Sequence, residues 1–233
     1  MRKIYFILFF SIISTVYSQE LKGSIEYSLI FTDDENLNNG DLANYFKKAK
    51  DNSKYISFML DFNNLEMNFY PIVKEIDGVN TSFSIAFSGV NGSYYRERGE
   101  NTIYRLIDDK AMGKHIVTND LNLEWKLENE QKKISELICY KATAKLKSNN
   151  GNNDFFIDVV AWYCPQIPYS YAPKGYNGLP GVVLELHERN VIIAAKNIDF
   201  NKEILNISKP KGKTITEKEY IELFQKFVDE NDH

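Results

Sequence analysis

Histidine, cysteine and the common catalytic motifs are what this sequence has least of. The 233 residues include three histidines, His115, His187 and His233, and none lies in the spacing of a zinc or hydrolase site. The chain has no G-x-S-x-G elbow, no phosphate-binding glycine loop and no dinucleotide-binding fingerprint. We therefore assign no catalytic residues and no cofactor, although absent motifs do not exclude an enzyme.

An excess of basic charge is also missing. Lys and Arg number 28 against 32 Asp and Glu, which gives a formal net charge of −4, and the charges are spread rather than gathered in blocks. Nucleic acids and anionic membrane surfaces favour a basic face. The composition therefore argues against both as partners.

The longest apolar run lies at the N-terminus. Arg2 and Lys3 precede the apolar run "IYFILFFSIISTVYS". This run is shorter than a membrane-spanning helix requires, and polar residues follow it directly. This pattern predicts a signal peptide over residues 1–18, with Val16 and Ser18 at the −3 and −1 positions of the cleavage site. The alternative is an N-terminal helix that stays attached, but no stop-transfer run follows it.

The predicted mature chain, residues 19–233, is long enough to bury the core of one domain. No cysteine follows the cleavage site directly, which argues against a lipid anchor. We expect a single exported domain in the periplasm or outside the cell, with no stable membrane span after cleavage.

Apolar residues alternate with polar ones from residue 21 to about residue 200. Ile25, Tyr27, Leu29 and Phe31 share one face of the first segment, as period-two burial requires. The polar segment 33–52 predicts a loop with a short helix around 41–50. Further strands are predicted at 82–88, 93–98, 102–108, 114–118, 122–128, 137–147, 155–164, 182–188 and 191–200.

The segment "YISFMLDFNNLEMNFY" predicts a hairpin that turns at Asn63-Asn64. A two-residue turn there would place one apolar face on the pairs Phe62/Leu65, Leu60/Met67 and Phe58/Phe69. The like charges of Asp61 and Glu66 would then oppose each other, which leaves a register shifted by about one residue as the alternative, although such a slip would mix the two faces.

One amphipathic helix is predicted at the C-terminal end. Thr216 and Glu219 have the spacing of a capping box, and Tyr220, Ile221, Phe224, Phe227 and Val228 form a stripe at helical spacing. We expect the stripe to pack against the sheet, with a partner-binding helix as the alternative. Together these patterns predict a mainly β fold: a strongly curved antiparallel meander, half-barrel-like, with a C-terminal helix.

Metal ligands are few. Glu185 and His187 are two residues apart, so they share a strand face and could form part of a metal site. Further ligands cannot be placed, and an ordinary solvated strand face explains the same pattern. We therefore predict no metal site and keep these two residues as weak candidates.

The stretch "AWYCPQIPYSYAPKGYNGLPGVVLEL" begins and ends like a strand but carries four prolines. Pro165, Pro168 and Pro173 remove backbone donors, so residues 165–177 should form an extended connection, a rigid crossover between two strand pairs. The corner that follows, Gly178-Leu179-Pro180-Gly181, should be structural. A type II turn over 179–182 would use the proline and a positive φ at Gly181.

The two cysteines fall on opposite strands of a second predicted hairpin. If the chain turns at Gly151-Asn152, opposed residue numbers sum to 303. Cys139 then lies opposite Cys164, at a Cα separation of about 4.5–5.5 Å that a disulfide tolerates. We predict this disulfide, with two separate buried thiols as the alternative.

Several of these segments resemble the GLPGLI family of exported Bacteroidota proteins. The resemblance extends over residues 94–227 and departs from the family pattern at Val182-Val183, Ala172-Pro173 and Cys164. Its motifs are Gly178-Leu179-Pro180-Gly181-Val182-Val183 with "LEL", Ala161-Trp162-Tyr163, Ile167-Pro168, Cys139 with Lys141-Ala142-Thr143, and "KNIDFNKEILNISKPKGKTITEKEYIELF". The resemblance implies a β-rich envelope or secreted protein without an established activity, and it supplies no catalytic residues.

The aromatic content points to binding rather than catalysis. Fifteen Tyr and fifteen Phe exceed what one sheet face buries, so some can line a site for an apolar ligand. We expect a non-enzymatic binding or carrier module for an apolar or envelope-derived ligand, with unknown binding residues. The alternatives are an envelope protein with a filled core that contacts other proteins, and a hydrolase or metal-dependent enzyme.

Export predicts a mature N-terminus at Gln19, which can cyclise. The intact mass of the protein recovered from the periplasm or the medium should correspond to residues 19–233. A mass that retains residues 1–18 would contradict the cleavage site and the export assignment.

Overall fold

The computed structural model describes residues 21–121, 123–149, 154–201 and 207–231. The helices of these residues are α1 (Glu35–Asn39), α2 (Ala43–Asn52), α3 (Ser82–Ser88) and α4 (Glu217–Asn231). The strands are β1 (Gly23–Phe31), β2 (Ile56–Phe62), β3 (Glu66–Val73), β4 (Ser93–Glu97), β5 (Thr102–Asp109), β6 (Gly113–Asp120), β7 (Lys126–Ile134), β8 (Leu137–Asn149), β9 (Asp154–Cys164), β10 (Val182–Glu188), β11 (Val191–Asp199) and β12 (Thr214–Thr216).

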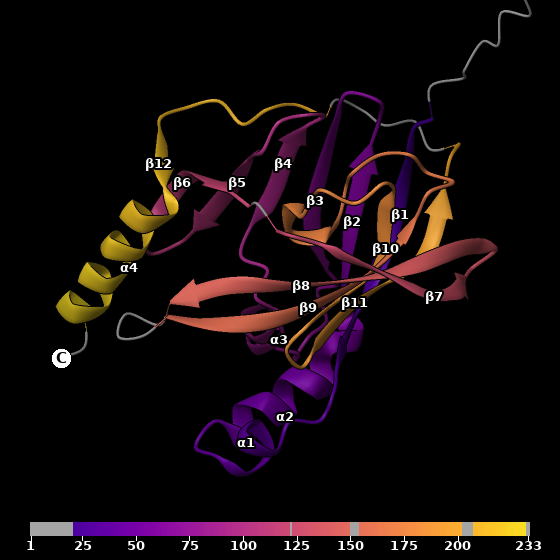
Figure 1. Cartoon of the computed structure of the whole chain (residues 1–233). Coiled ribbons are helices and arrows are strands. Elements are labelled where there is room, and N and C mark those ends of the chain that lie inside the picture. Colours follow the sequence, from indigo (N-terminus) through magenta and orange to yellow (C-terminus); the bar gives the residue numbers. More distant parts are fainter. Residues whose placement is uncertain (1–20, 122, 150–153, 202–206, 232–233) are drawn as a thin grey trace, which may run out of the picture.

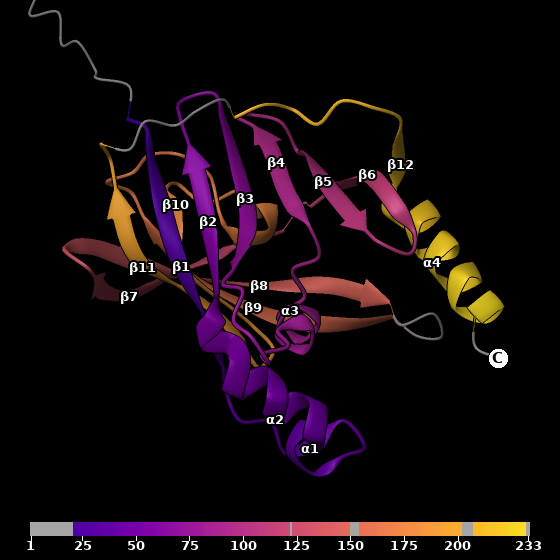
Figure 2. The same cartoon turned by 180° about the vertical axis from the view of Figure 1, so that it is seen from behind.

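These strands form one sheet in the order β12-β6-β5-β4-β3-β2-β1-β11-β10-β9-β8-β7 (Figures 1 and 2). Neighbouring strands pair antiparallel, apart from β12, which runs parallel to β6. The sheet is strongly twisted, since β8 and β9 run across the direction of β2 and β3 in Figure 1. It does not close into a barrel, and the predicted mainly β class with a C-terminal helix is confirmed.

The core lies on one face of β1, β2 and β3. The predicted alternation of the first strand is confirmed, because Ile25, Tyr27, Leu29 and Phe31 are all buried. The facing side chains of β2 and β3 complete this core: Phe58, Leu60, Phe62, Met67 and Phe69. Burying these side chains supplies most of the free energy that holds the sheet together.

The β2–β3 hairpin has the predicted apolar face but another register. Phe62 lies opposite Met67 and Leu60 opposite Phe69, two positions away from the predicted pairs. The cause is a longer loop, in which Asn63 Oδ1 accepts the N–H groups of Leu65 at 2.7 Å and Glu66 at 2.9 Å. A shift of two residues keeps every side chain on its face, so the burial prediction survives the wrong pairing.

The predicted strand at 82–88 is wrong, because these residues form helix α3. Phe83 and Phe87 alternate as a strand requires, but they are also four residues apart, as on one helical face. That face packs against α2, with the Phe46 and Phe87 rings 5.3 Å apart, and Ser84 donates to the carbonyl of Ala49 at 2.7 Å. Gly89 ends the helix with φ +67.

Two other predicted elements are correct only in part. The strand expected at 122–128 begins at Lys126 as β7, and residue 122 lies outside the described residues. The capping box of α4 is present, since Glu219 N–H donates to Thr216 Oγ1 at 3.2 Å and Thr216 N–H to Glu219 Oε2 at 2.7 Å. Of the predicted stripe, however, only Tyr220 is buried, so α4 packs on the sheet through its first turn alone.

The proline-rich segment is not a crossover. The strands that it joins, β9 and β10, are neighbours in the sheet, with Cys164 opposite Val182. Residues 165–181, which we call the β9–β10 loop, contain no strand and turn back over the core. The centre of the Tyr169 ring lies 5.9 Å from the centre of the Phe62 ring. The buried apolar side chains of the loop include Ile167, Tyr169, Tyr171, Ala172, Tyr176 and Leu179.

The structural role of the Gly-Leu-Pro-Gly corner stays a prediction, and the corner does not form the predicted type II turn. Val182 N–H donates to the carbonyl of Ile167 at 3.0 Å, and the positive φ, +91, belongs to Gly178 rather than Gly181. Gly181 is required for another reason. A Cβ at this position would overlap the carbonyl oxygen of Cys164 and lie 2.8 Å from Pro165 N.

The β8–β9 register agrees with the prediction, but the disulfide does not. Opposed residue numbers sum to 303 from Tyr140/Tyr163 onward, and the turn at Gly151-Asn152 lies outside the described residues. Cys139 and Cys164 are buried free thiols, so the predicted bond is not supported. The β8–β9 ladder ends at Tyr140/Tyr163, one position before the two cysteines, and there Cys164 pairs with Val182 of β10 while Cys139 pairs with Lys132 of β7. Hydrogen bonding to Cys139 lowers the pKa of Cys164 to about 6 and raises that of Cys139.

We expect Gly181→Ala to lower the free energy of unfolding by about 1–3 kcal/mol, as for overpacked core sites. The added methyl group has only backbone atoms to push against, so the loop must move off β9. Pro180→Ala is the matched control in the same corner, because Pro180 is exposed and its loss should cost no more than about 1 kcal/mol. Urea unfolding measures both, and equal losses would contradict the close approach of Gly181.

Candidate ligand-binding cleft

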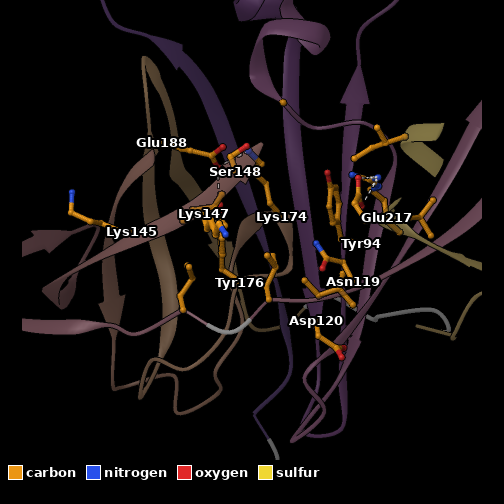
Figure 3. Close-up of a pocket in the computed structure, with 18 residues that line it drawn as sticks. Tyr94, Asn119, Asp120, Lys145, Lys147, Ser148, Lys174, Tyr176, Glu188 and Glu217 are labelled. Carbon is orange, nitrogen blue, oxygen red and sulfur yellow. Dashed lines mark hydrogen bonds and ion pairs between the residues drawn. The ribbon is translucent and has the colours of Figure 1, made fainter. Parts of the chain in front are cut away.

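A cleft of about 580 Å³ lies between the two halves of the twisted sheet. Figure 3 shows that the labelled side chains other than Lys145 lie on two sides of it. Lys147, Ser148, Lys174, Tyr176 and Glu188 come from β8, β10 and the β9–β10 loop. Tyr94, Asn119, Asp120 and Glu217 come from β4, β6 and α4.

Part of the cleft wall is apolar. Ile103 and Val117 are buried side chains of β5 and β6, and Ile221 of α4 lies at the edge with 56% of its surface exposed. The loop approaches this wall closely, because Gly175 has φ +75 and a Cβ there would lie 2.9 Å from Ile103 Cδ1. Leu121, Leu123 and Leu146 complete the apolar lining.

A small polar network forms the wall on the loop side. Lys174 Nζ lies 2.6 Å from Glu188 Oε2, and the side chains of this pair are only 13% and 16% exposed. The Tyr176 hydroxyl donates to the same carboxylate oxygen at 3.0 Å. Burial, reinforced by the charge of Glu188, raises the pKa of Tyr176, so this phenol remains protonated. Lys174 has φ +59, which is uncommon for a residue other than glycine.

The opposite wall carries a second ion pair. Arg105 Nη2 donates to both carboxylate oxygens of Glu217, at 2.8 and 2.9 Å, and its guanidinium lies 5.6 Å from the centre of the Tyr220 ring. These contacts tie the first turn of α4 to β5. They hold Ile221 at the edge of the cleft.

The two other lysines of the cleft are also paired, and its one remaining carboxylate among the lining residues, Asp120, accepts a hydrogen bond. Lys145 contacts Asp158 and Lys147 contacts Asp154, both at 2.6 Å, and Figure 3 shows Lys145 pointing outward. Asp120 accepts the Thr102 hydroxyl at 2.6 Å. Every Lys and Arg that lines the cleft therefore already has a carboxylate partner.

The weak metal candidates lie elsewhere. Glu185 on β10 binds the His187 ring and Lys132 Nζ, the latter at 2.6 Å. Burial would raise the pKa of Glu185, but hydrogen bonds from His187 and Lys132 outweigh it and lower that pKa. Within the described ranges, no group of three or more His, Cys, Asp or Glu gathers as a metal site would require.

Sequence analysis singled out none of the polar cleft residues. Arg105 and Glu217 are 112 positions apart, and no local pattern connects them. Lys174 and Tyr176 offered a weak signal, because a charged and an aromatic residue in a proline-rich loop are candidates for a site. Of the stripe predicted on the C-terminal helix, Ile221 reaches the cleft.

Comparisons with known proteins give a short family match and a distant likeness in fold. The model of a family described as a protein of unknown function, Porph_ging, matches residues 152–185, which span β9 and the β9–β10 loop. The GLPGLI name is not confirmed. No curated protein matches this chain.

Two solved structures of PNGF-II, in space groups P21 and C2, are similar to this chain with a TM-score of 0.55 each. They are 12% and 13% identical in sequence, and each match covers 89% of this chain. The chain spans about a third of the length of PNGF-II, 34% and 33% in the two structures. At this identity the likeness shows the fold alone.

We expect Lys174→Met to lower the free energy of unfolding by about 1–3 kcal/mol, because it leaves Glu188 largely buried without its counter-charge. Lys145→Met is the matched control, since its pair with Asp158 is 67% and 80% exposed and should contribute within about 0.5 kcal/mol. Chemical denaturation at pH 7 compares the two variants. Similar losses from both would show that the Lys174–Glu188 pair does not stabilise the wall.

Proposed function

We propose that this protein is an exported, non-enzymatic binding module whose cleft takes a neutral amphiphile, a molecule with an apolar chain and an uncharged polar end. The observation that carries this proposal is the combination of an apolar lining with charges that are already paired. The cleft volume, about 580 Å³, lies within the usual range of about 300–1,000 Å³ for small-molecule sites.

The apolar chain would lie along the Ile103, Val117 and Leu146 side of the cleft. Removing such a chain from water contributes about 25 cal/mol per Å² of apolar surface. The uncharged end would face the Tyr94, Asn119 and Tyr176 side, where phenol and amide groups can exchange hydrogen bonds with hydroxyl groups.

A charged ligand fits this cleft less well. An anionic head group would compete with Glu188 for Lys174 or with Glu217 for Arg105, and a cationic one would compete with those cations for the carboxylates. Breaking a partly buried pair leaves a charge uncompensated. Because the ion pairs in both walls are already formed, the cleft favours a ligand whose polar end is neutral.

An interaction role in the envelope is the second candidate. The β9–β10 loop fills the inner face of the sheet beside the cleft, and α4 exposes Leu223 and Phe224. These exposed side chains suit contact with another protein more than the enclosure of a small ligand. A cleft that binds no amphiphile would favour this second role.

Export is part of the proposal and rests on the N-terminal pattern of residues 1–18. Among the described residues, no helix has the length and apolar character needed to span a membrane. The periplasm or the extracellular space is therefore the compartment in which the ligand would be met.

Octyl glucoside below its micellar concentration is a direct probe of the cleft. We expect saturable binding of octyl glucoside by isothermal titration calorimetry. Octanoate, which has an alkyl chain of similar length but a charged end, should bind more weakly. Ile221→Glu should raise the apparent Kd of octyl glucoside about tenfold, because it removes one large apolar contact worth about 1.5 kcal/mol.

Leu223→Glu is the control on the same helix, since Leu223 is exposed and does not line the cleft. Its Kd should equal that of the unmodified protein. Absence of binding, or an equal loss in both variants, would overturn the assignment of the cleft. If the assignment of the cleft is correct, native mass spectrometry of the protein purified from its own envelope should show a retained neutral ligand.

A further inference from the structure

The largest fully buried side chain of the described residues is an arginine. Arg96 lies on β4 opposite Met67 of β3, which in turn lies opposite Phe62 of β2. Only 1% of its surface is exposed. The strand alternation thus places a cation in line with two core side chains, where an apolar residue would be expected.

One end of the Arg96 guanidinium is satisfied. Nη1 donates to the carbonyl of Glu100 at 2.9 Å and to the Asn177 side-chain oxygen, while the Asn177 amide donates to the carbonyl of Leu121 at 3.0 Å. These bonds connect the end of β4 to the β9–β10 loop. They fix the plane of the guanidinium.

The other edge of the same group has no partner. Arg96 Nε and Nη2 are buried and make no hydrogen bond to any residue that the structure describes. Their N–H bonds lie side by side along one edge of the planar group, the fork that fits two oxygens of a carboxylate or phosphate. No ion pair of Arg96 with a described carboxylate lies within 4.0 Å.

Tyr171, a second residue with an unpaired donor, lines the same pocket. The pocket has a volume of about 170 Å³ and is bounded by Arg96 and the β4–β5 turn on one side and by Ser170, Tyr171 and Asn177 on the other. The Tyr171 hydroxyl is buried and has no partner among the described residues. Burial raises the pKa of Tyr171, so this group can donate a hydrogen bond at physiological pH.

Arg96 remains charged in this setting. Burial lowers its pKa to about 10, which is still far above neutral pH. The charge of Asp120 opposes this effect of burial on the pKa, but it accepts no hydrogen bond from Nε or Nη2, and buried donors without a partner are costly. This unpaired edge fits an anionic acceptor from outside the described residues.

We propose that this pocket binds a carboxylate group of a small ligand, with Arg96 Nε and Nη2 donating to its two oxygens and the Tyr171 hydroxyl donating to one of them. The site is separate from the cleft, because the two share no lining residue. It does not depend on the proposed binding of an amphiphile.

The charges around the pocket favour a monoanion. Glu97 and Glu100 line it together with Arg96 and Arg98, so the formal charges of the lining side chains already balance. A carboxylate places one negative charge against the Arg96 fork, whereas a dianionic phosphate would place a second charge near two glutamates.

Acetate and N-acetylglycine test the proposal at pH 7 and constant ionic strength, with chloride as the reference. We expect saturable binding by calorimetry and a thermal unfolding midpoint that rises with the concentration of the carboxylate. Binding of acetate alone would indicate a free small acid as the ligand. Binding of N-acetylglycine as well would indicate the carboxylate end of a larger molecule.

Arg96→Lys keeps the charge but removes the fork, and it should raise the apparent Kd at least about tenfold. Tyr171→Phe removes one hydrogen bond and should raise Kd about three- to tenfold. Arg98→Lys is the matched control, because it keeps the charge of a residue that lines the same pocket and changes only a guanidinium that lies 5.3 Å from the centre of the Tyr169 ring. It should bind acetate as the unmodified protein does.

No saturable carboxylate binding by the unmodified protein would overturn the proposal. Equal binding by the unmodified, Arg96→Lys and Tyr171→Phe proteins would also overturn it, because the effect would then be a general salt effect. Tyr171→Phe keeps the test decisive if the Arg96 variant fails to fold, since this change removes only the unpaired hydroxyl.

Discussion

The inner face of the sheet has to be covered, and one loop covers it. Phe62 and Tyr27 point inward from β2 and β1, and an open, twisted sheet cannot bury such side chains with strands alone. Tyr169 of the β9–β10 loop packs against Phe62. The Tyr27 hydroxyl donates a hydrogen bond to the carbonyl of Val183 at 2.8 Å. Gly181 makes this cover possible, because the loop backbone returns directly against Cys164.

Both candidate sites arise where this cover ends. On one side Lys174 and Tyr176 of the loop face β4, β5 and β6 across the cleft, and the Lys174–Glu188 pair keeps that wall polar. On the other side Tyr171 and Asn177 close over Arg96. The same loop therefore fills the core and presents polar side chains at its two margins, where the two candidate sites lie.

Strand positions and caps were predictable because they depend on near neighbours. The β8–β9 register follows from alternation, and the Thr216/Glu219 box from a spacing of three residues. The errors arise where distant contacts decide. Phe83 and Phe87 suit a strand or a helix, and packing against Phe46 of α2 selects the helix. The predicted disulfide is not supported: the β8–β9 ladder ends one position before Cys139 and Cys164, which pair with β7 and β10 and remain free thiols.

The sequence alone determined the mainly β class, the order of most strands along the chain, the faces they bury and the capped C-terminal helix, because period-two and period-3.6 patterns are local. The tertiary structure decided that the proline-rich segment is a cover rather than a crossover, and it decided the partners of Arg96, Arg105 and Lys174. Charges separated by 112 positions, as in Arg105 and Glu217, or by 170, as in Lys196 and Glu26, form ion pairs in the fold, and no local spacing in the sequence indicates these pairs. The sites could therefore be found only once the sheet had brought its two halves together.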